Sequence, residues 1–163
     1  MLQAKPAISV RQAKPRDIPR LVELETICFD GIYSEHRYSR SDFERAVEDR
    51  DYTLLLAESD ARGIIGCAVG RKQNRKSGLT GDVISIAVDP SARGNGVGKR
   101  LLRALLGRLS RQGCGRKVAE VAESNEPSRR LIRGAGFAPE RRLNDYYGKG
   151  NHAVRMALNP VRD

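Results

Sequence analysis

The residues best suited to chemistry lie in the segment SIAVDPSARGNGVGKRLL, where a strand-like run leads through a glycine-rich turn into an amphipathic helix. Arg93, Gly96 and Gly98 stand in the order Arg-x-x-Gly-x-Gly, and Gly94 adds a third glycine. Glycines let backbone N–H groups converge without interference from side chains, and a helix N-terminus carries a partial positive charge. The turn is therefore predicted to bind phosphate. The alternative is a plain connection between a strand and a helix.

Two common phosphate-binding motifs do not fit this turn. The spacing of a P-loop is absent, and the Gly-x-Gly-x-x-Gly pattern of dinucleotide-binding folds cannot be read there. The turn instead resembles the signature of the GCN5-related N-acetyltransferases, which is Arg or Gln, two residues, Gly, one residue, and Gly or Ala. The resemblance continues in VAEVAESN, SRRLIRGAGF and NDYYG. Within this family the chain looks most like the bacterial enzymes that acetylate the N-terminal alanine of a ribosomal protein (RimI type).

The resemblance implies that acetyl-CoA is the acetyl donor and that backbone atoms hold most of it. In the family, the strand before the turn pairs with the pantetheine arm, and the amides of the turn hold the pyrophosphate. The cofactor-binding residues implied in this chain are Ile86, Ala87, Val88, Arg93, Gly94, Asn95, Gly96, Val97, Gly98, Lys99 and Asn125. Asn125 has a second interpretation, because asparagine is also a frequent N-cap residue of helices.

The implied reaction is attack of an uncharged amine on the thioester, so a protonated amine must first lose a proton to a general base. Glu120 stands at the family position with that role, whereas spacing alone makes it a solvent-facing residue like Glu123. The RimI-type pattern also has a tyrosine that protonates the departing thiolate, and here that position is Ile132. Tyr147 and Tyr146 are the candidate replacements, and their alternative role is to line the acceptor groove.

The charge distribution suggests separate surfaces for the two substrates. Residues 17–60 include twelve acidic and five basic residues, whereas residues 93–142 include thirteen basic and four acidic residues. The basic half suits a polyanion such as coenzyme A, although basic runs are often only solvated faces or non-specific binders of nucleic acid. Acidic residues near the FDGIYSEHRY loop are expected to attract a cationic amine. The predicted substrate-binding residues are Glu25, Asp30, Glu35 and Tyr146.

The composition limits the class of protein. A length of 163 residues, with 39% hydrophobic and 31% charged residues, suits a single domain over residues 1–163. The longest uncharged run, GIIGCAVG, is too short for a membrane helix, and the N-terminal segment lacks the apolar block of a secretory signal. We therefore expect a cytoplasmic protein.

Cysteine and histidine offer no support for a metal site. Cys28, Cys67 and Cys114 are odd in number and far apart, which fits neither a disulfide framework nor a zinc cluster. The two histidines, His36 and His152, lie in polar surroundings typical of surface residues. No metal cofactor is predicted.

Hydrophobic periodicity predicts an α/β fold with the element order βααβββαβαββ. Strands are predicted at 7–13, 52–58, 63–72, 81–90, 117–123, 137–147 and 152–158. Helices are predicted at 18–29, 41–49, 97–109 and 126–136, and segment 30–39 is expected to be a loop. Asp17 is the expected N-cap of the first helix, and Ser41 with Glu44 has the spacing of a capping box for the second. The three strands from 52 to 90 should form an antiparallel meander. Together with the resemblance, this indicates a mixed, mostly antiparallel sheet flanked by helices.

The predicted function is transfer of an acetyl group from acetyl-CoA to a primary amine by direct attack. The leading acceptor is the N-terminal α-amine of a protein or peptide, including a ribosomal protein. The enzyme alternatives are a small amine, such as a polyamine or aminoglycoside, and an internal lysine. A catalytically weak acyl-CoA sensor is a further alternative, supported by Ile132. An RNA-binding protein is disfavoured because 5% aromatic residues with no tryptophan offer few stacking platforms. Neither a specific nucleic acid nor a membrane is an expected partner.

Overall fold

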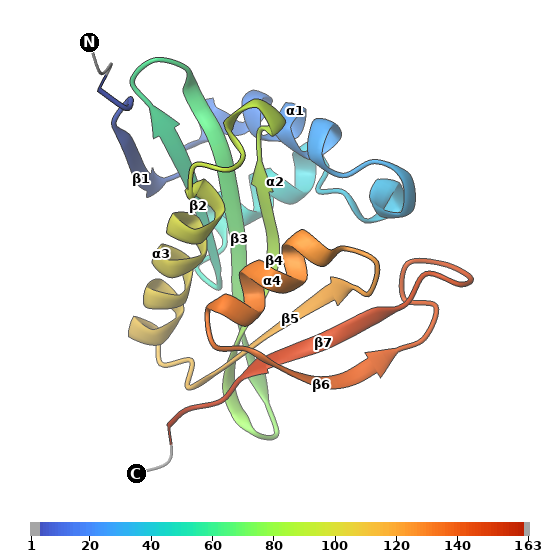
Figure 1. The fold of residues 1–163 in the computed structure, drawn as a ribbon. Helices are drawn as coiled ribbons and strands as arrows, with labels where there is room; N and C mark the ends of the chain where they lie inside the picture. Colours follow the sequence, from blue (N-terminus) through green and yellow to red (C-terminus); the bar gives the residue numbers. More distant parts are fainter. Residues whose placement is uncertain (1–3, 162–163) are drawn as a thin grey trace.

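A seven-stranded sheet forms the centre of the computed structural model, which describes residues 4–161 (Figure 1). Across the sheet the strands follow the order β1-β2-β3-β4-β5-β7-β6. All neighbours are antiparallel except β4 and β5, which confirms the predicted mixed, mostly antiparallel sheet. The strands are β1 (Ile8–Gln12), β2 (Tyr52–Ser59), β3 (Gly63–Arg75), β4 (Gly78–Val88), β5 (Arg116–Ala122), β6 (Ala138–Leu143) and β7 (Ala153–Leu158).

Helices connect these strands in the predicted order βααβββαβαββ. Short 3₁₀ helices add turns that the periodicity did not predict. Within residues 4–161, no helix is both long and apolar enough to cross a membrane. The helices are η1 (Pro15–Asp17), α1 (Ile18–Cys28), η2 (Gly31–His36), α2 (Arg40–Glu48), η3 (Pro90–Ala92), α3 (Val97–Arg111) and α4 (Glu126–Gly134).

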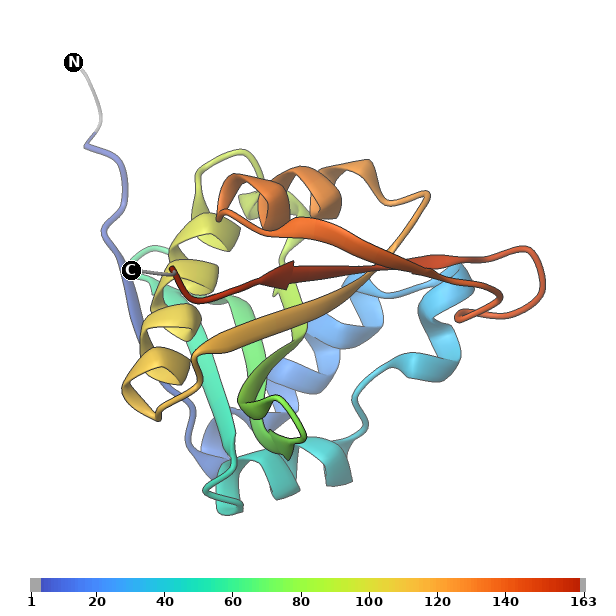
Figure 2. The ribbon, with the colours of Figure 1, turned by 90° about the horizontal axis from the view of Figure 1, so that it is seen from below.

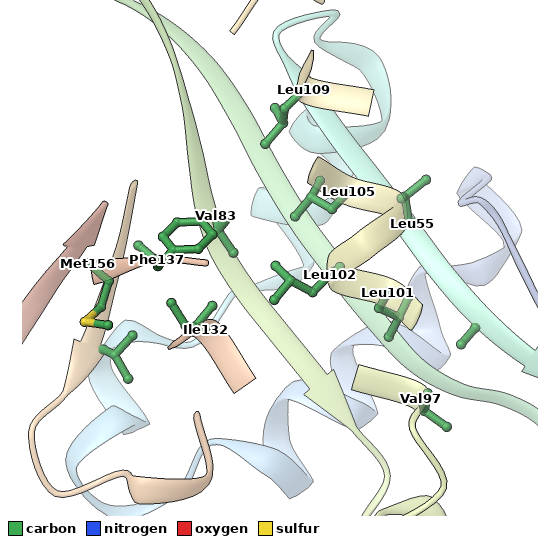
Figure 3. Packing of buried hydrophobic residues seen from close by; sticks show 14 of the residues in the cluster. Leu55, Val83, Val97, Leu101, Leu102, Leu105, Leu109, Ile132, Phe137 and Met156 are labelled. Carbon is green, nitrogen blue, oxygen red and sulfur yellow. The ribbon is translucent and has the colours of Figure 1, made fainter. Parts of the chain in front are cut away.

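The α-helices cover the two faces of the sheet in pairs (Figure 2). Helices α3 and α4 lie over one face, and α1 and α2 lie over the other. The apolar stripe of α3 points into the core, where Leu101, Leu105 and Leu109 are fully buried (Figure 3). A Cβ atom on Gly70 of β3 would lie 2.7 Å from Leu105 Cδ1. Glycine at this position therefore allows α3 to lie close to the sheet.

Strands β4 and β5 pair along only part of their length. Parallel pairing joins Thr80–Val83 to Arg116–Ala119, and beyond these residues the two strands separate. A register shift at the Val69–Gly70 step of β3 leaves Ile84 of β4 without a partner there, and pairing with β3 then continues to Val88. In the described part of the chain, the edge of β4 that faces β5 therefore has no strand beside it from Ile84 onwards.

Two predicted helix caps differ from the structure. Helix α2 is capped by Ser39, not Ser41: Ser39 Oγ accepts the Asp42 N–H at 3.3 Å, and Asp42 Oδ2 accepts the Ser39 N–H at 2.8 Å. Ser39 has the extended backbone that an N-cap requires. Asp17 occupies the predicted N-cap position of α1, but its backbone is helical and its side chain makes no capping hydrogen bond. Its carboxylate instead accepts two hydrogen bonds from Arg11 at 2.8 and 3.0 Å. The guanidinium thus holds the side chain that was expected to cap the helix.

The segment expected to be a loop contains the 3₁₀ helix η2. Asp30 caps it, because its carboxylate accepts the Gly31 N–H at 2.8 Å. A 3₁₀ helix forms hydrogen bonds between residues three apart. One as short as η2 needs no apolar stripe, so hydrophobic periodicity could not reveal it. Its position next to the opening between β4 and β5 brings Tyr33 and His36 to the functional site.

Candidate active site

A cavity of about 580 Å³ occupies the opening between β4 and β5. Its walls come from α1, η2, β4, the turn before α3, β5 and α4, and Tyr147 from the β6–β7 loop completes them. The size is in the range of ligand-binding pockets. The partial separation of two strands therefore creates one site from segments that are far apart in the sequence.

The glycine-rich turn forms one end of this cavity. Gly94 and Gly96 adopt left-handed φ angles of 80° and 76°, and α3 begins directly afterwards at Val97. The first N–H groups of a helix have no partner within it, and its partial positive charge is concentrated there. Arg93 and Lys99 add cationic side chains to the same wall. This end of the cavity is therefore suited to an anion such as phosphate.

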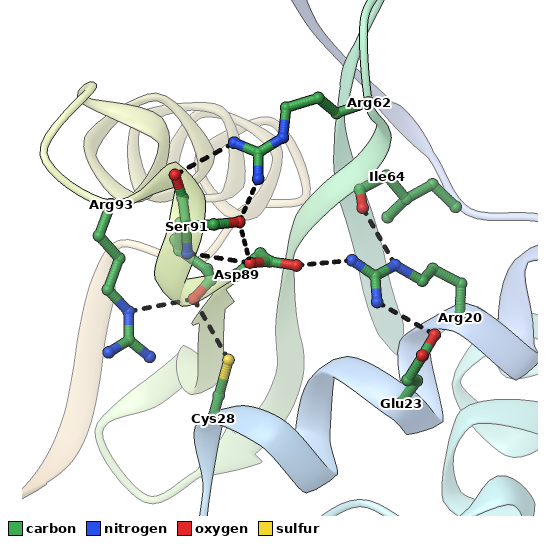
Figure 4. A network of polar contacts seen from close by, with 9 residues as sticks. Arg20, Glu23, Cys28, Arg62, Ile64, Asp89, Ser91 and Arg93 are labelled. Atoms are coloured by element: carbon green, nitrogen blue, oxygen red, sulfur yellow. Dashed lines mark hydrogen bonds and ion pairs between the residues drawn. The ribbon is translucent and has the colours of Figure 1, made fainter.

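A polar network supports the turn from behind (Figure 4). Asp89 accepts hydrogen bonds from the backbone N–H and hydroxyl of Ser91, and from Arg20 of α1 at 2.8 Å. Arg20 also donates to the Ile64 carbonyl of β3 at 3.2 Å, and Arg62 donates to the Ser91 carbonyl at 3.1 Å. The bonds from Ser91, together with Arg20, lower the pKa of Asp89 to about 2. The network thereby joins α1, β3 and the turn.

All but two of the predicted cofactor-binding residues line the cavity. Ala87 is 1% exposed and packs in the core between the sheet and helices α1 and α2. The Asn95 side chain turns back on its own loop and donates to the carbonyls of Ala92 and Arg93 at 3.1 and 3.3 Å. These two residues can therefore contact a ligand in the cavity only through backbone atoms.

Asn125 combines two contacts at the start of α4. Its Oδ1 accepts the Ser128 N–H at 3.2 Å, which is the N-cap interaction that its sequence context suggests. Its Nδ2 donates to Tyr33 Oη at 2.9 Å, and the side chain lines the cavity. The capping role is therefore present, and it places the amide on the wall of the site.

Glu120 lines the cavity from β5, and its side chain is 20% exposed. Its Oε1 accepts hydrogen bonds from Arg155 Nε at 3.0 Å and Nη2 at 2.8 Å. Its Oε2 accepts no hydrogen bond from the residues that the structure describes, so this oxygen can take a proton. Glu123 differs, because it lies outside the cavity and pairs with Arg142 at 2.8 Å.

Aromatic residues from two loops meet at the other end of the cavity. The ring of Tyr147 lies edge-on to Tyr33 at 5.0 Å, to His36 at 5.3 Å and to Tyr146 at 4.9 Å. Tyr147 lines the cavity, and its hydroxyl donates to the Glu120 carbonyl at 3.4 Å. Burial raises the pKa of Tyr147. Tyr146 is 43% exposed and lies outside the lining.

The three predicted acceptor acids occupy different environments. Glu25 lines the cavity but is only 2% exposed, and it accepts hydrogen bonds from the Ser85 hydroxyl at 2.9 Å and the Tyr38 N–H at 3.2 Å. Burial raises the pKa of Glu25. Asp30 and Glu35 are exposed and do not line the cavity. Attraction of a cationic amine by the exposed carboxylates of Asp30 and Glu35 stays a prediction. Glu25, by contrast, is a buried part of the cavity wall.

Sequence reasoning did not single out two residues of the site. Tyr33 was not assigned a role. His36 is exposed, as predicted for a surface residue, and both residues line the cavity. The available signal was the concentration of tyrosine and histidine between residues 33 and 38. Ile132 also lines the cavity and is 3% exposed, and its hydrocarbon side chain has no proton to donate.

A mixed, mostly antiparallel sheet flanked by helices, with a glycine-rich turn leading into a helix, is the arrangement that the resemblance to the acetyltransferases implied. The chain belongs to that family: the acetyltransferase (GNAT) family model matches residues 18–137.

Two relatives illustrate the extent of the similarity in sequence. The chain is 28% identical to N-alpha-acetyltransferase 30 of Saccharomyces cerevisiae over 95 residues, which cover 58% of this chain and 54% of that protein. It is 32% identical to an uncharacterized protein of Mycobacterium leprae over 123 residues, which cover 76% of this chain and 32% of that protein. The chain thus spans about a third to a half of the length of these relatives.

Solved structures share the fold across most of the chain. The ribosomal-protein-alanine N-acetyltransferase of Brucella melitensis superposes with a TM-score of 0.77 at 21% identity, covering 93% of this chain and 99% of that chain. A chain of the NatC complex bound to Gag peptide and CoA superposes with a TM-score of 0.81 at 20% identity, covering 95% and 99%. At these identities, the likeness demonstrates a common fold.

Replacing Gly96 by valine should weaken coenzyme A binding. The substitution strains a left-handed residue and places a side chain where the turn presents its amides. Loss of one or two bonds to a charged ligand predicts an affinity lower by about tenfold or more in a calorimetric titration with coenzyme A. Gly78→Val is the matched control, because Gly78 also has a positive φ, of 103°, and lies in the β3–β4 hairpin at the end of β4 away from the turn. Equal losses in both variants would show that strain alone explains the effect.

The Asp89 network should make stability depend on acidic pH. The pKa of Asp89 is about 2 in the folded chain, below its ordinary value of 3.8. Its carboxylate therefore contributes stability fully above pH 3.8, and this contribution disappears as the pH falls through about 2. Urea unfolding should show Asp89→Asn to be less stable than the wild type at pH 7, with the difference shrinking below pH 4. Asp60→Asn, in the exposed β2–β3 turn, is the control. A difference that stays constant down to pH 2.5 would contradict this role.

Proposed function

We propose that this protein transfers the acetyl group of acetyl-CoA to the N-terminal α-amine of a protein or peptide. The observation that supports it most is the two-ended cavity between β4 and β5. One end has an anion-binding turn, and the other has a carboxylate, Glu120, beside a group of aromatic side chains.

The residues present fit acetyl-CoA. The turn at Gly94 and Gly96, with Arg93 and Lys99, suits the phosphates. Within residues 4–161, the edge of β4 that faces β5 has no neighbouring strand from Ile84 onwards, so its backbone groups can pair with the amides of the pantetheine arm as an added strand would. When bound, acetyl-CoA supplies an acyl group activated as a thioester.

Glu120 is the proposed general base. Glu120 lines the cavity and Arg155 donates to one of its carboxylate oxygens, so the other oxygen can accept the amine proton directly or through one water. A protonated α-amine has an ordinary pKa of about 8, so a base is needed near neutral pH. The aromatic side chains around Tyr147 provide flat apolar surfaces for the first residues of a peptide.

The choice of acceptor rests on both geometry and relatives. Tyr33 and His36 of η2 and Tyr147 of the β6–β7 loop line one end of the cavity, where their rings can contact the first residues of a peptide. Among the relatives in sequence, the yeast protein is an N-alpha-acetyltransferase. Among the structural neighbours is a ribosomal-protein-alanine N-acetyltransferase, and ribosomal proteins are accordingly included among the proposed acceptors.

A panel of amines tests the proposed acceptor. We expect acetylation of peptides with a free N-terminus, at the α-amine as located by mass spectrometry, and none of the same peptides with a blocked N-terminus and an internal lysine. Spermidine and an aminoglycoside serve as small-amine comparisons. Faster turnover of a small amine would overturn the peptide assignment. Binding of acetyl-CoA without transfer to any amine would indicate an acyl-CoA sensor.

Glu120→Gln tests the base. The amide keeps the shape of the side chain but cannot take a proton, so kcat/KM should fall by about 10²-fold near neutral pH. The loss should be smaller at alkaline pH, where more of the amine is already uncharged. Glu123→Gln is the matched control, because Glu123 lies three residues after Glu120 and outside the cavity. An equal loss at every pH would argue against a basic role for Glu120.

A further inference from the structure

Release of coenzyme A is assisted by an acid that protonates its sulfur, just as attack by the amine is assisted by a base. When the bond between the acyl carbon and sulfur breaks, the sulfur leaves as a thiolate, and a positioned acid assists this step by protonating it. Ile132 lies on the cavity wall at the position where the RimI-type pattern implies a tyrosine. The chain must therefore use another acid or release the thiolate unprotonated.

Several hydroxyl and thiol groups on the wall already donate their hydrogen to the protein. The Ser85 hydroxyl donates to Glu25 at 2.9 Å, and the Cys28 thiol donates to the Val88 carbonyl at 3.3 Å. The Tyr147 hydroxyl donates to the Glu120 carbonyl at 3.4 Å. These protons are directed away from the space that a ligand would fill.

The Tyr33 hydroxyl differs from these groups, because it accepts a hydrogen bond from the protein. The Ser128 N–H can only donate, so the Asn125 atom that it meets at 3.2 Å is the oxygen Oδ1. The Asn125 nitrogen Nδ2 therefore faces Tyr33 Oη at 2.9 Å and donates to it. The Tyr33 oxygen is the acceptor, and within residues 4–161 its own hydrogen has no protein acceptor. The ring is fixed edge-on between Phe29 at 5.7 Å and Tyr147 at 5.0 Å.

The Tyr33 hydroxyl also lies where a tyrosine at position 132 would reach. Position 132 is seven residues beyond Asn125, which is about 10 Å along α4. Long side chains on a helix lean toward its N-terminus, so a tyrosine at 132 would direct its hydroxyl toward the first turn of α4. Asn125 holds the Tyr33 hydroxyl at that turn. Tyr33 on η2 and a tyrosine placed at position 132 on α4 would thus bring their phenol groups to the same part of the cavity.

We propose that Tyr33 donates the proton that the coenzyme A sulfur takes up in the reaction. This inference rests on the proposed function. Glu120 first passes the proton of the protonated amine to solvent. The uncharged nitrogen then forms a bond to the acyl carbon and gives up a second proton to Glu120. The carbon–sulfur bond breaks, the sulfur keeps the electron pair, and the Tyr33 hydroxyl proton moves to it. Solvent then returns a proton to Tyr33 and removes one from Glu120.

The surroundings of Tyr33 are compatible with this role. Burial raises the pKa of Tyr33, although the bond from Asn125 acts in the opposite direction, so the phenol is protonated at neutral pH. Tyr38 also lines the cavity, but it packs edge-on against Phe43 in the core beneath α2, on the side away from α4. The Ser128 hydroxyl also lies on the cavity wall at α4, but an aliphatic alcohol is a much weaker acid than a phenol. Tyr33 is therefore the phenol that, among the residues described, combines a fixed position at α4 with a hydrogen that no protein group accepts.

Tyr33→Phe is the direct test, with Tyr147→Phe as the matched control. Tyr33→Phe should lower kcat by about tenfold to 10²-fold, with little change in the KM for peptide or in coenzyme A affinity. Tyr147→Phe should mainly raise the KM for peptide. Adding Ile132→Tyr should restore part of the kcat lost in Tyr33→Phe, because it brings a phenol to the same place, and it should not rescue Tyr147→Phe.

A second measurement does not depend on packing a tyrosine at position 132. Fluorotyrosine at position 33 keeps the size of the ring but ionises at lower pH. Because the acid must be protonated, the alkaline decline of kcat should move to lower pH, and it should do so in the Tyr147→Phe background as well. That background removes the hydroxyl of Tyr147, whose ring lies 5.0 Å from the ring of Tyr33.

The outcomes separate this inference from the proposed function. A raised KM for peptide with unchanged kcat in Tyr33→Phe would overturn the inference and leave Tyr33 as a substrate-binding residue. A fall in kcat with neither rescue by Ile132→Tyr nor a fluorotyrosine shift would also overturn it. Wild-type protein that binds acetyl-CoA but acetylates no amine would instead contradict the proposed function.

Discussion

The end of pairing between β4 and β5 after Val83 and Ala119 is the feature on which the whole site depends. Up to that level the two strands share an ordinary parallel ladder. Beyond it, β4 remains paired with β3 on one side only, and its other edge presents backbone donors and acceptors. Because such groups are costly to leave unsatisfied, the opening favours a ligand that is rich in amides. The same separation creates the cavity that the surrounding helices and loops line.

The two ends of the cavity are built in different ways. The anion-binding end is fixed by the core, because α3 packs closely on β3 at Gly70 and the Asp89 network joins the turn to α1. The other end consists of η2 and the β6–β7 loop, which meet through aromatic contacts. A turn fixed by the core and an opposite end built from loops fit the proposed transfer from acetyl-CoA to an amine.

Features encoded locally could be predicted from the sequence. The turn at Gly94 and Gly96 requires left-handed backbone angles, which glycine adopts readily, so the residue types themselves indicate the conformation. Helix α3 follows from its apolar stripe, and the order of strands and helices follows from the alternation of apolar residues. Errors occurred where two local patterns competed, as at Ser39 and Ser41, or where a short helix has no apolar stripe, as in η2.

Only the tertiary structure decided which side chains meet in the site. Tyr33 and Asn125 are 92 residues apart, and Glu120 and Arg155 are 35 residues apart. The hydrophobic period of a segment reports which of its faces is buried, but it says nothing about which distant segment covers that face. The burial of Glu25, the free oxygen of Glu120 and the direction of the Tyr33 hydroxyl each follow from such distant neighbours. The sequence by itself therefore determined the anion-binding turn and the elements around it, and the packing of α1, η2 and α4 around the separated strands determined the chemistry at the other end.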